Sequence, residues 1–183
     1  MTSLMEQISN ERRRLRSVRL RMAAAIELQA NGNKAFVPFY IAAADYIDAT
    51  MQRLHEQDIK MGQIITDKVG EPDDQTRQAL SELDERLTGA KAQLEPFLAA
   101  RDALRARGSD ALNDFEKAAQ IYSDFIVANM GHHGATMDLS KKLFAPEDWE
   151  YMAGVSDEQS AFDEQLFNRV VTTMPQGVAE PTG

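Results

Sequence analysis

The sequence predicts an all-α protein, an up-down antiparallel four-helix bundle with a short extra C-terminal helix. Residues that favour helix, above all alanine, leucine, glutamate, glutamine and arginine, dominate the chain. Apolar residues recur at helical spacing in four long stretches, and short breaker segments separate these stretches. Long helices joined by short connections pack as antiparallel neighbours.

The first two helices are predicted at about residues 3–30 and 38–68. The first has an apolar stripe from Leu4 to Ile26 and stops at the breaker "NGN". The second begins near Pro38, because proline is accepted in the first turn of a helix, and it ends at "VGEPDD". The acidic residues of that breaker are placed to cap the next helix.

The later helices follow the same pattern. The third is predicted at 75–107, with a kink at Pro96 rather than a division into two helices. The fourth begins near Ala111, and "FAPEDWEYM" marks the short extra helix with Pro146 in its first turn. We therefore expect one domain over residues 1–170 and a disordered tail over 171–183.

The charge and amino-acid composition of the chain argue against several classes of function. The net charge of -9 argues against nonspecific nucleic-acid binding, because phosphate backbones attract positive charge. The chain has no cysteine, so disulfides, cysteine-rich zinc sites and thiol catalysis are excluded. No apolar run approaches the roughly 20 residues that span a bilayer, and the start lacks the apolar core of a signal peptide. We expect a cytoplasmic protein with neither a membrane nor a nucleic acid as its partner.

Basic residues cluster near the start of the chain. The run comprises Arg12, Arg13, Arg14, Arg16, Arg19 and Arg21. We interpret it as a solvated helix face, with a basic groove for an anion as the alternative.

Polar residues interrupt the apolar stripes at one position or more on each long helix. Buried polar groups are costly without partners, so we expect these residues to meet one another inside the bundle, with Arg12 and Arg86 pairing with nearby acids. The interrupting residues are Arg12, His55, Asp58, Asp84, Glu85, Arg86, Asn129 and one of the adjacent pair His132 and His133.

The segments that carry these residues resemble those of a known family over roughly residues 5 to 155. "DALNDFEKAAQIYSDFIVANM" followed by "LFAPEDWEYM" resembles the last helix and closing segment of hemerythrin-like (HHE cation-binding) domains. "YIDATMQRLH" resembles their second helix, and "ISNERRRLRSV" and "SELDERLTGA" resemble the ligand-bearing parts of the first and third. The resemblance implies a four-helix bundle in which histidines and two bridging carboxylates hold two irons that bind dioxygen or perform peroxide chemistry.

The ligand positions implied by the resemblance are mostly filled by other residues. Arg12, Arg86 and Asn129 stand at histidine positions of the first, third and fourth helices. His55 matches a ligand on the second helix, but the carboxylate expected four residues later is Ile59, with only Asp58 nearby. Arginine is always protonated and cannot become a metal ligand, so the resemblance implies a bundle that has lost its diiron site.

Two main functional interpretations follow, and a third is that iron or oxygen chemistry persists through ligands at other positions. In the first, the bundle binds no cofactor and is a non-catalytic binding or interaction protein. A polar cluster then replaces the metals, made of Arg12, Arg86, Asp58, Glu85 and Asn129. Its partner is a small anion, a protein or a second copy of the chain. In the alternative, His55, Asp58 and one of His132 and His133 bind iron or zinc and leave a position open for dioxygen. The chain has no serine elbow or phosphate loop, so we do not expect an enzyme.

Overall fold

The computed structural model describes residues 3–129 and 134–182, and these residues form helices and turns with no strand. The all-α class is therefore confirmed. The helices in chain order are α1 (Leu4–Leu28), α2 (Phe36–Val69), α3 (Asp74–Arg107), the 3-10 turn η1 (Gly108–Ala111), α4 (Leu112–Ala128), α5 (Gly134–Leu143), α6 (Pro146–Ala153) and α7 (Asp157–Thr172).

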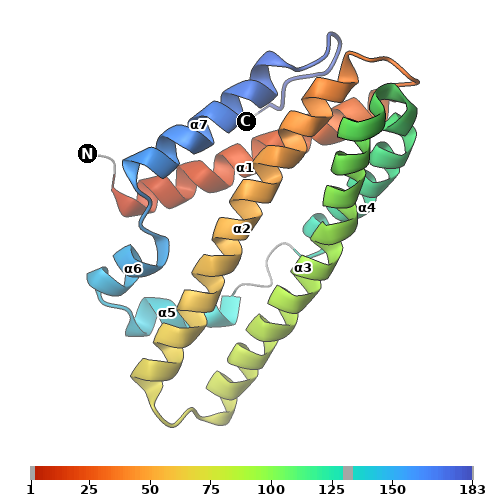
Figure 1. The fold of residues 1–183 in the computed structure, drawn as a ribbon. Coiled ribbons are helices and arrows are strands. Elements are labelled where there is room, and N and C mark those ends of the chain that lie inside the picture. Colours follow the sequence, from red (N-terminus) through yellow and green to blue (C-terminus); the bar gives the residue numbers. More distant parts are fainter. Residues whose placement is uncertain (1–2, 130–133, 183) are drawn as a thin grey trace.

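Helix α2 lies at the centre of the molecule. It packs against α1, α3, α5, α6 and α7, and α4 lies beside α3 (Figure 1). Its N-terminal half buries a run of small residues, Ala42, Ala43 and Ala44, that lets neighbouring helices come close. The turn at residues 70–73 reverses the chain, so α2 and α3 run antiparallel along their length (Figure 1).

Aromatic rings fill the space where α2, α3 and α4 meet. The Phe115 ring of α4 lies 4.9 Å from the Tyr40 ring and 5.7 Å from the Phe97 ring, measured between centroids. Phe97 stacks on Tyr122 at 4.9 Å with an interplanar angle of 12°. All four side chains are fully buried, so this cluster supplies much of the apolar burial that holds the three helices together.

Glu116 ties the end of α1 to the same cluster. Its Oε1 accepts a hydrogen bond from the Tyr40 hydroxyl at 2.6 Å and another from the Ala30 backbone N–H at 2.8 Å. Burial and the neighbouring carboxylate raise the pKa of Tyr40 far above the ordinary tyrosine value. Tyr40 therefore stays protonated and keeps donating this bond at any physiological pH.

The short helix α6 is held to α2 by one charged residue. Asp148 accepts from Lys68 Nζ at 2.8 Å and from the Ala145 N–H at 2.7 Å, so it pairs with α2 and caps its own helix. Pro146 occupies the first turn of α6, as predicted. Trp149 packs edge-on against Phe144 with ring centroids 5.2 Å apart.

The C-terminal third differs from the prediction. One short extra helix was expected after the fourth, whereas the structure has α5, α6 and α7. Helix α7 packs along α2 and lies beside α1 (Figure 1). Leu166 and Val170 are buried one turn apart on α7, a pattern too short and too mixed with polar residues to stand out in the sequence.

The segment predicted to be a disordered tail also packs against the helices. Helix α7 continues to Thr172, and Val178 is buried in the same apolar cluster as α1 and α2. Arg21 Nη1 lies 3.2 Å from the Met174 sulfur. The polar and proline-rich composition predicted disorder, whereas Met174 and Val178 of this segment pack against the apolar core.

Helix α3 runs unbroken from Asp74 to Arg107 with Pro96 inside it, as predicted for a single helix.

No helix among the described residues combines the length and the apolar run that crossing a bilayer requires.

Replacing Phe115 with alanine should lower the free energy of unfolding by about 3–5 kcal/mol, because the substitution leaves a cavity at the centre of the aromatic cluster. Urea denaturation followed by circular dichroism measures this loss. The matched control is Ile121→Ala on the same helix, which is 64% exposed and should cost no more than about 0.5 kcal/mol. Equal losses in the two variants would contradict the placement of the core.

Replacing Asp148 with asparagine should destabilise the protein at neutral pH but not in acid. The hydrogen bonds from Lys68 and Ala145 hold the pKa of Asp148 below its ordinary value. A carboxylate with a lowered folded-state pKa stabilises the protein above its unfolded-state pKa, and this contribution disappears as the pH falls through the folded-state pKa. The stability gap between wild type and Asp148→Asn, measured by urea denaturation, should therefore stay constant above about pH 5 and narrow as the pH falls below about 4. Asp138→Asn, at an exposed position on α5, should show no such pH dependence.

Candidate functional site

The structure brings two of the predicted site residues together. Arg86 of α3 faces Asp58 of α2, with Nη2 and Oδ2 3.7 Å apart. Their side chains are 14% and 22% exposed, so the pair lies mostly between the two helices. An ion pair of Arg86 with a nearby acid was predicted, and Asp58 is that partner.

The other residues at the proposed ligand positions point elsewhere. Asn129 ends α4, and its Nδ2 donates to the Phe125 carbonyl oxygen at 2.8 Å. Arg12 is exposed on α1, so the expected inward position for this guanidinium is wrong. A one-residue step around a helix is about 100°, and here it brings Glu11 rather than Arg12 to the interior.

The predicted metal ligands are only partly placed. His55 is half-buried on α2, three residues before Asp58. His132 and His133 lie outside the described residues. Over residues 3–129 and 134–182, no three histidine, aspartate or glutamate side chains converge in a group that could hold a metal ion.

A second polar cluster, which the sequence did not indicate, joins α1, α2 and α7. The Arg53 guanidinium of α2 donates from Nε to Glu11 Oε1 at 2.8 Å, and its Nη2 also pairs with Glu11. On its other side, Nη1 lies 2.8 Å from Asp163 Oδ2 and 3.0 Å from Oδ1. Gln159 Nε2 adds a bond to Asp163 Oδ1 at 2.9 Å.

This Arg53 cluster is largely withdrawn from solvent. The side chains of Arg53, Glu11 and Asp163 are 14%, 13% and 13% exposed. Burial by itself lowers the pKa of Arg53, but the hydrogen bonds and charges of Glu11 and Asp163 outweigh it, so the pKa lies above the ordinary arginine value. One guanidinium thus faces two carboxylates, so the cluster carries a net negative charge.

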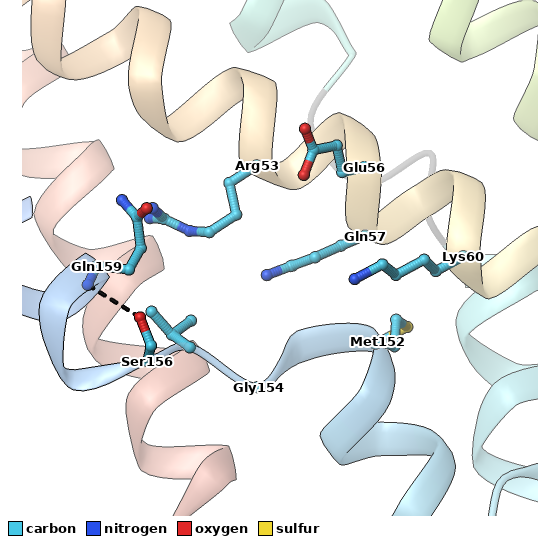
Figure 2. Close-up of a pocket in the computed structure, with 9 residues that line it drawn as sticks. Arg53, Glu56, Gln57, Lys60, Met152, Gly154, Ser156 and Gln159 are labelled. Atoms are coloured by element: carbon cyan, nitrogen blue, oxygen red, sulfur yellow. Dashed lines mark hydrogen bonds between the residues drawn. The ribbon is translucent and has the colours of Figure 1, made fainter.

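A polar cavity of about 220 Å³ opens beside the Arg53 cluster, between α2 and the connection from α6 to α7. Gln57 and Lys60 reach from α2 toward this connection, and their nitrogen atoms turn to the open centre, whereas Glu56 turns away (Figure 2). The remaining lining residues are Arg53, Met152, Gly154, Val155, Ser156 and Gln159.

The shape of this cavity depends on Gly154. A Cβ atom at this position would lie 2.4 Å from the Glu150 carbonyl oxygen, so only glycine fits the turn between α6 and α7. Ser156 begins α7, and its hydroxyl accepts from the Gln159 N–H at 3.1 Å. Ser156 therefore serves as a helix cap, and the cavity offers hydrogen-bond donors to a small polar group rather than a nucleophile with its base.

A third polar cluster joins α2 to α3. Arg101 Nη1 lies 2.8 Å from Asp48 Oδ2 and 3.2 Å from Asp45 Oδ1, and Arg105 also pairs with Asp45.

The buried Tyr122 hydroxyl has no hydrogen-bond partner among the described residues. Burial, followed by the negative charge of Asp48, raises the pKa of Tyr122 well above the ordinary tyrosine value.

No family model matches this chain, and none of the curated proteins or solved structures compared with it is a match. The resemblance to hemerythrin-like domains therefore rests on the residues quoted above.

Replacing Arg53 with methionine should destabilise the protein by about 3 kcal/mol, because Glu11 and Asp163 would then face each other without a cation. Thermal and urea denaturation measure the loss. Arg77→Met removes an exposed arginine that pairs with Asp74 one turn away, and it should cost less than about 1 kcal/mol.

A triple variant separates unpaired charge from lost packing. Adding Glu11→Gln and Asp163→Asn to Arg53→Met removes the repulsion and should recover a measurable part of the stability. If the triple variant is less stable than Arg53→Met alone, the carboxylates are not held by this arginine.

Proposed function

We propose that this chain is a non-catalytic binding or interaction protein, built as a hemerythrin-like up-down antiparallel four-helix bundle that has lost its diiron site. The observation that carries the proposal is the Arg86–Asp58 pair. At a position where the resemblance calls for a metal-binding histidine, a guanidinium lies between α2 and α3 against a carboxylate.

The chemistry of this pair disfavours a metal. Arginine remains protonated in proteins and has no lone pair to donate to a metal ion. A fixed positive charge between the helices also repels cations, and it engages Asp58, the carboxylate that the alternative interpretation would use beside His55. The Asn129 side-chain amide donates a hydrogen bond to the Phe125 carbonyl oxygen, so it caps the end of its own helix.

The same pair offers an anion little attraction, because Asp58 already offsets the charge of Arg86. We therefore place recognition of a partner on the outer surface of the bundle rather than in the former metal position. Protein partners, including a second copy of this chain, fit this function better than a small anion held between α2 and α3.

Metal analysis tests the proposal directly. Protein expressed in iron-supplemented medium should be colourless, lack the near-ultraviolet absorption of oxo-bridged iron, and contain less than about one tenth of an iron or zinc per chain. Elemental mass spectrometry and an absorption spectrum provide the two measurements.

The alternative function, residual iron or zinc binding, gives the opposite result. Metal near one per chain that is lost in His55→Ala, but kept in the control Glu56→Ala at the adjacent exposed position, would replace our proposal with a metal site at His55.

A further inference from the structure

A straight seam of arginines runs along the outer side of α1. Positions 5, 9, 12, 16, 19 and 23 are separated by steps of 4, 3, 4, 3 and 4 residues, which is the spacing of a coiled-coil seam. The residues at these positions are Met5, Ser9, Arg12, Arg16, Arg19 and Ala23. Met5, Ser9, Arg12 and Arg16 are exposed, and Arg19 and Ala23 are half-buried.

The structure divides the arginine run of α1 into two groups. Arg14 lies over the Phe167 ring at 5.5 Å, and Arg21 is buried with Ser17, Met174 and Glu180 around it. Those two arginines help to hold α7 and the C-terminal segment. The outward group comprises Arg12, Arg16 and Arg19 on the seam and Arg13 beside it, whose Nη1 donates to Asn10 Oδ1 at 3.2 Å.

The seam arginines have no acidic partner. Within residues 3–129 and 134–182, each ion pair of an arginine with an acid involves an arginine outside the seam. The residues beyond these ranges carry no aspartate or glutamate. In a chain with 29 acidic residues and only 20 lysines and arginines, a row of unpaired guanidiniums departs from the general pattern.

The seam arginines also repel one another. Arg12 and Arg16 are one turn apart, and so are Arg16 and Arg19, and like charges at this spacing destabilise a helix. Burial and then the positive charge of Arg16 lower the pKa of Arg19 below the ordinary arginine value. A row of carboxylates laid against the seam would relieve this repulsion.

We propose that the seam of α1 is a docking surface for an acidic α-helix of a partner protein. The partner helix lies along α1 and places glutamate or aspartate side chains, at its own steps of three and four residues, opposite Arg12, Arg16 and Arg19. Met5, which is 62% exposed, supplies an apolar contact at the end of the seam. The inference rests on the interaction function proposed above and names the class of partner.

The spacing and chemistry favour this partner over other polyanions. Three arginines within about 10 Å along one helix match carboxylates on a facing helix, and the planar guanidinium binds a carboxylate with two parallel hydrogen bonds. A long nucleic acid would meet the net charge of -9 on the rest of the chain. An anionic membrane surface binds helices that have a free apolar face, whereas the apolar side of α1, with Val18, Met22 and Ala25, is buried.

A charge-swap experiment tests the proposal on the full chain. The probes are two labelled helical peptides with the same framework, one with glutamates and one with lysines at the seam-facing positions. The double variant Arg12→Glu/Arg16→Glu reverses the seam, and the matched control Lys141→Glu/Lys142→Glu makes the same charge change at exposed positions of α5. Fluorescence anisotropy measures binding, and circular dichroism checks that each variant is folded.

The wild type and the α5 control should bind the glutamate peptide at least about tenfold more tightly than the lysine peptide, with affinity falling as salt rises. The seam variant should reverse this preference and gain affinity for the lysine peptide. Loss of glutamate-peptide binding alone would not support the proposal, because a folding defect would also produce it. A reversed preference requires a folded α1 with the substituted charges on the seam.

Three outcomes would overturn the inference. The first is that the wild type binds neither peptide, and the second is that the seam variant and the α5 control behave alike. The third is tighter binding of the wild type to a short DNA duplex or to phosphatidylserine vesicles than to the glutamate peptide, which would assign the seam to a phosphate-bearing partner. Stoichiometric iron in the protein would contradict the proposed function without changing these peptide results.

Discussion

The pairing of partly buried charges on α2 with charges from other helices is the constraint on which the rest of the structure depends. Helix α2 has other helices packed along its length, so a charged side chain on one of its packed faces cannot simply turn to water. Asp45 and Asp48 meet Arg101 of α3, and Asp58 meets Arg86 further along the same helix. Arg53 meets acids from α1 and α7, and Lys68 meets Asp148 of α6. These ion pairs fix α1, α3, α6 and α7 at defined positions along α2.

This arrangement differs from the metal-held bundle that the resemblance to hemerythrin-like domains implies. A diiron centre would hold the same helices together through metal–ligand bonds from several helices at one level. Here, salt bridges at several levels of α2 join the helices in pairs or threes. Such bridges add little net stability when compared with apolar packing, but removing one partner leaves a buried charge, which makes alternative registers costly. The aromatic cluster around Phe115 supplies the packing energy, and the bridges select one arrangement.

The two groups of arginines on α1 show how one sequence motif serves two purposes. Arg14 and Arg21 turn toward α7 and the C-terminal segment, where they contact an aromatic ring, a thioether sulfur and a carboxylate. Arg12 and Arg16 turn outward on the same helix. A step of one residue changes the direction of a side chain by about 100°, so adjacent arginines in one run face different surroundings.

The sequence by itself determined the all-α class, the long helices with their approximate ends, the single helix through Pro96, the start of α6 at Pro146 and an acid as the partner of Arg86. Periodicity, caps and breakers are local signals, so they can be read without knowing what lies across the interface. The tertiary structure alone decided that Glu11 and not Arg12 faces inward, that Arg53 joins three helices, and that α7 and Val178 pack onto the bundle. These features depend on the rotation of each helix about its axis and on partners distant in the chain, and no local pattern encodes either of them.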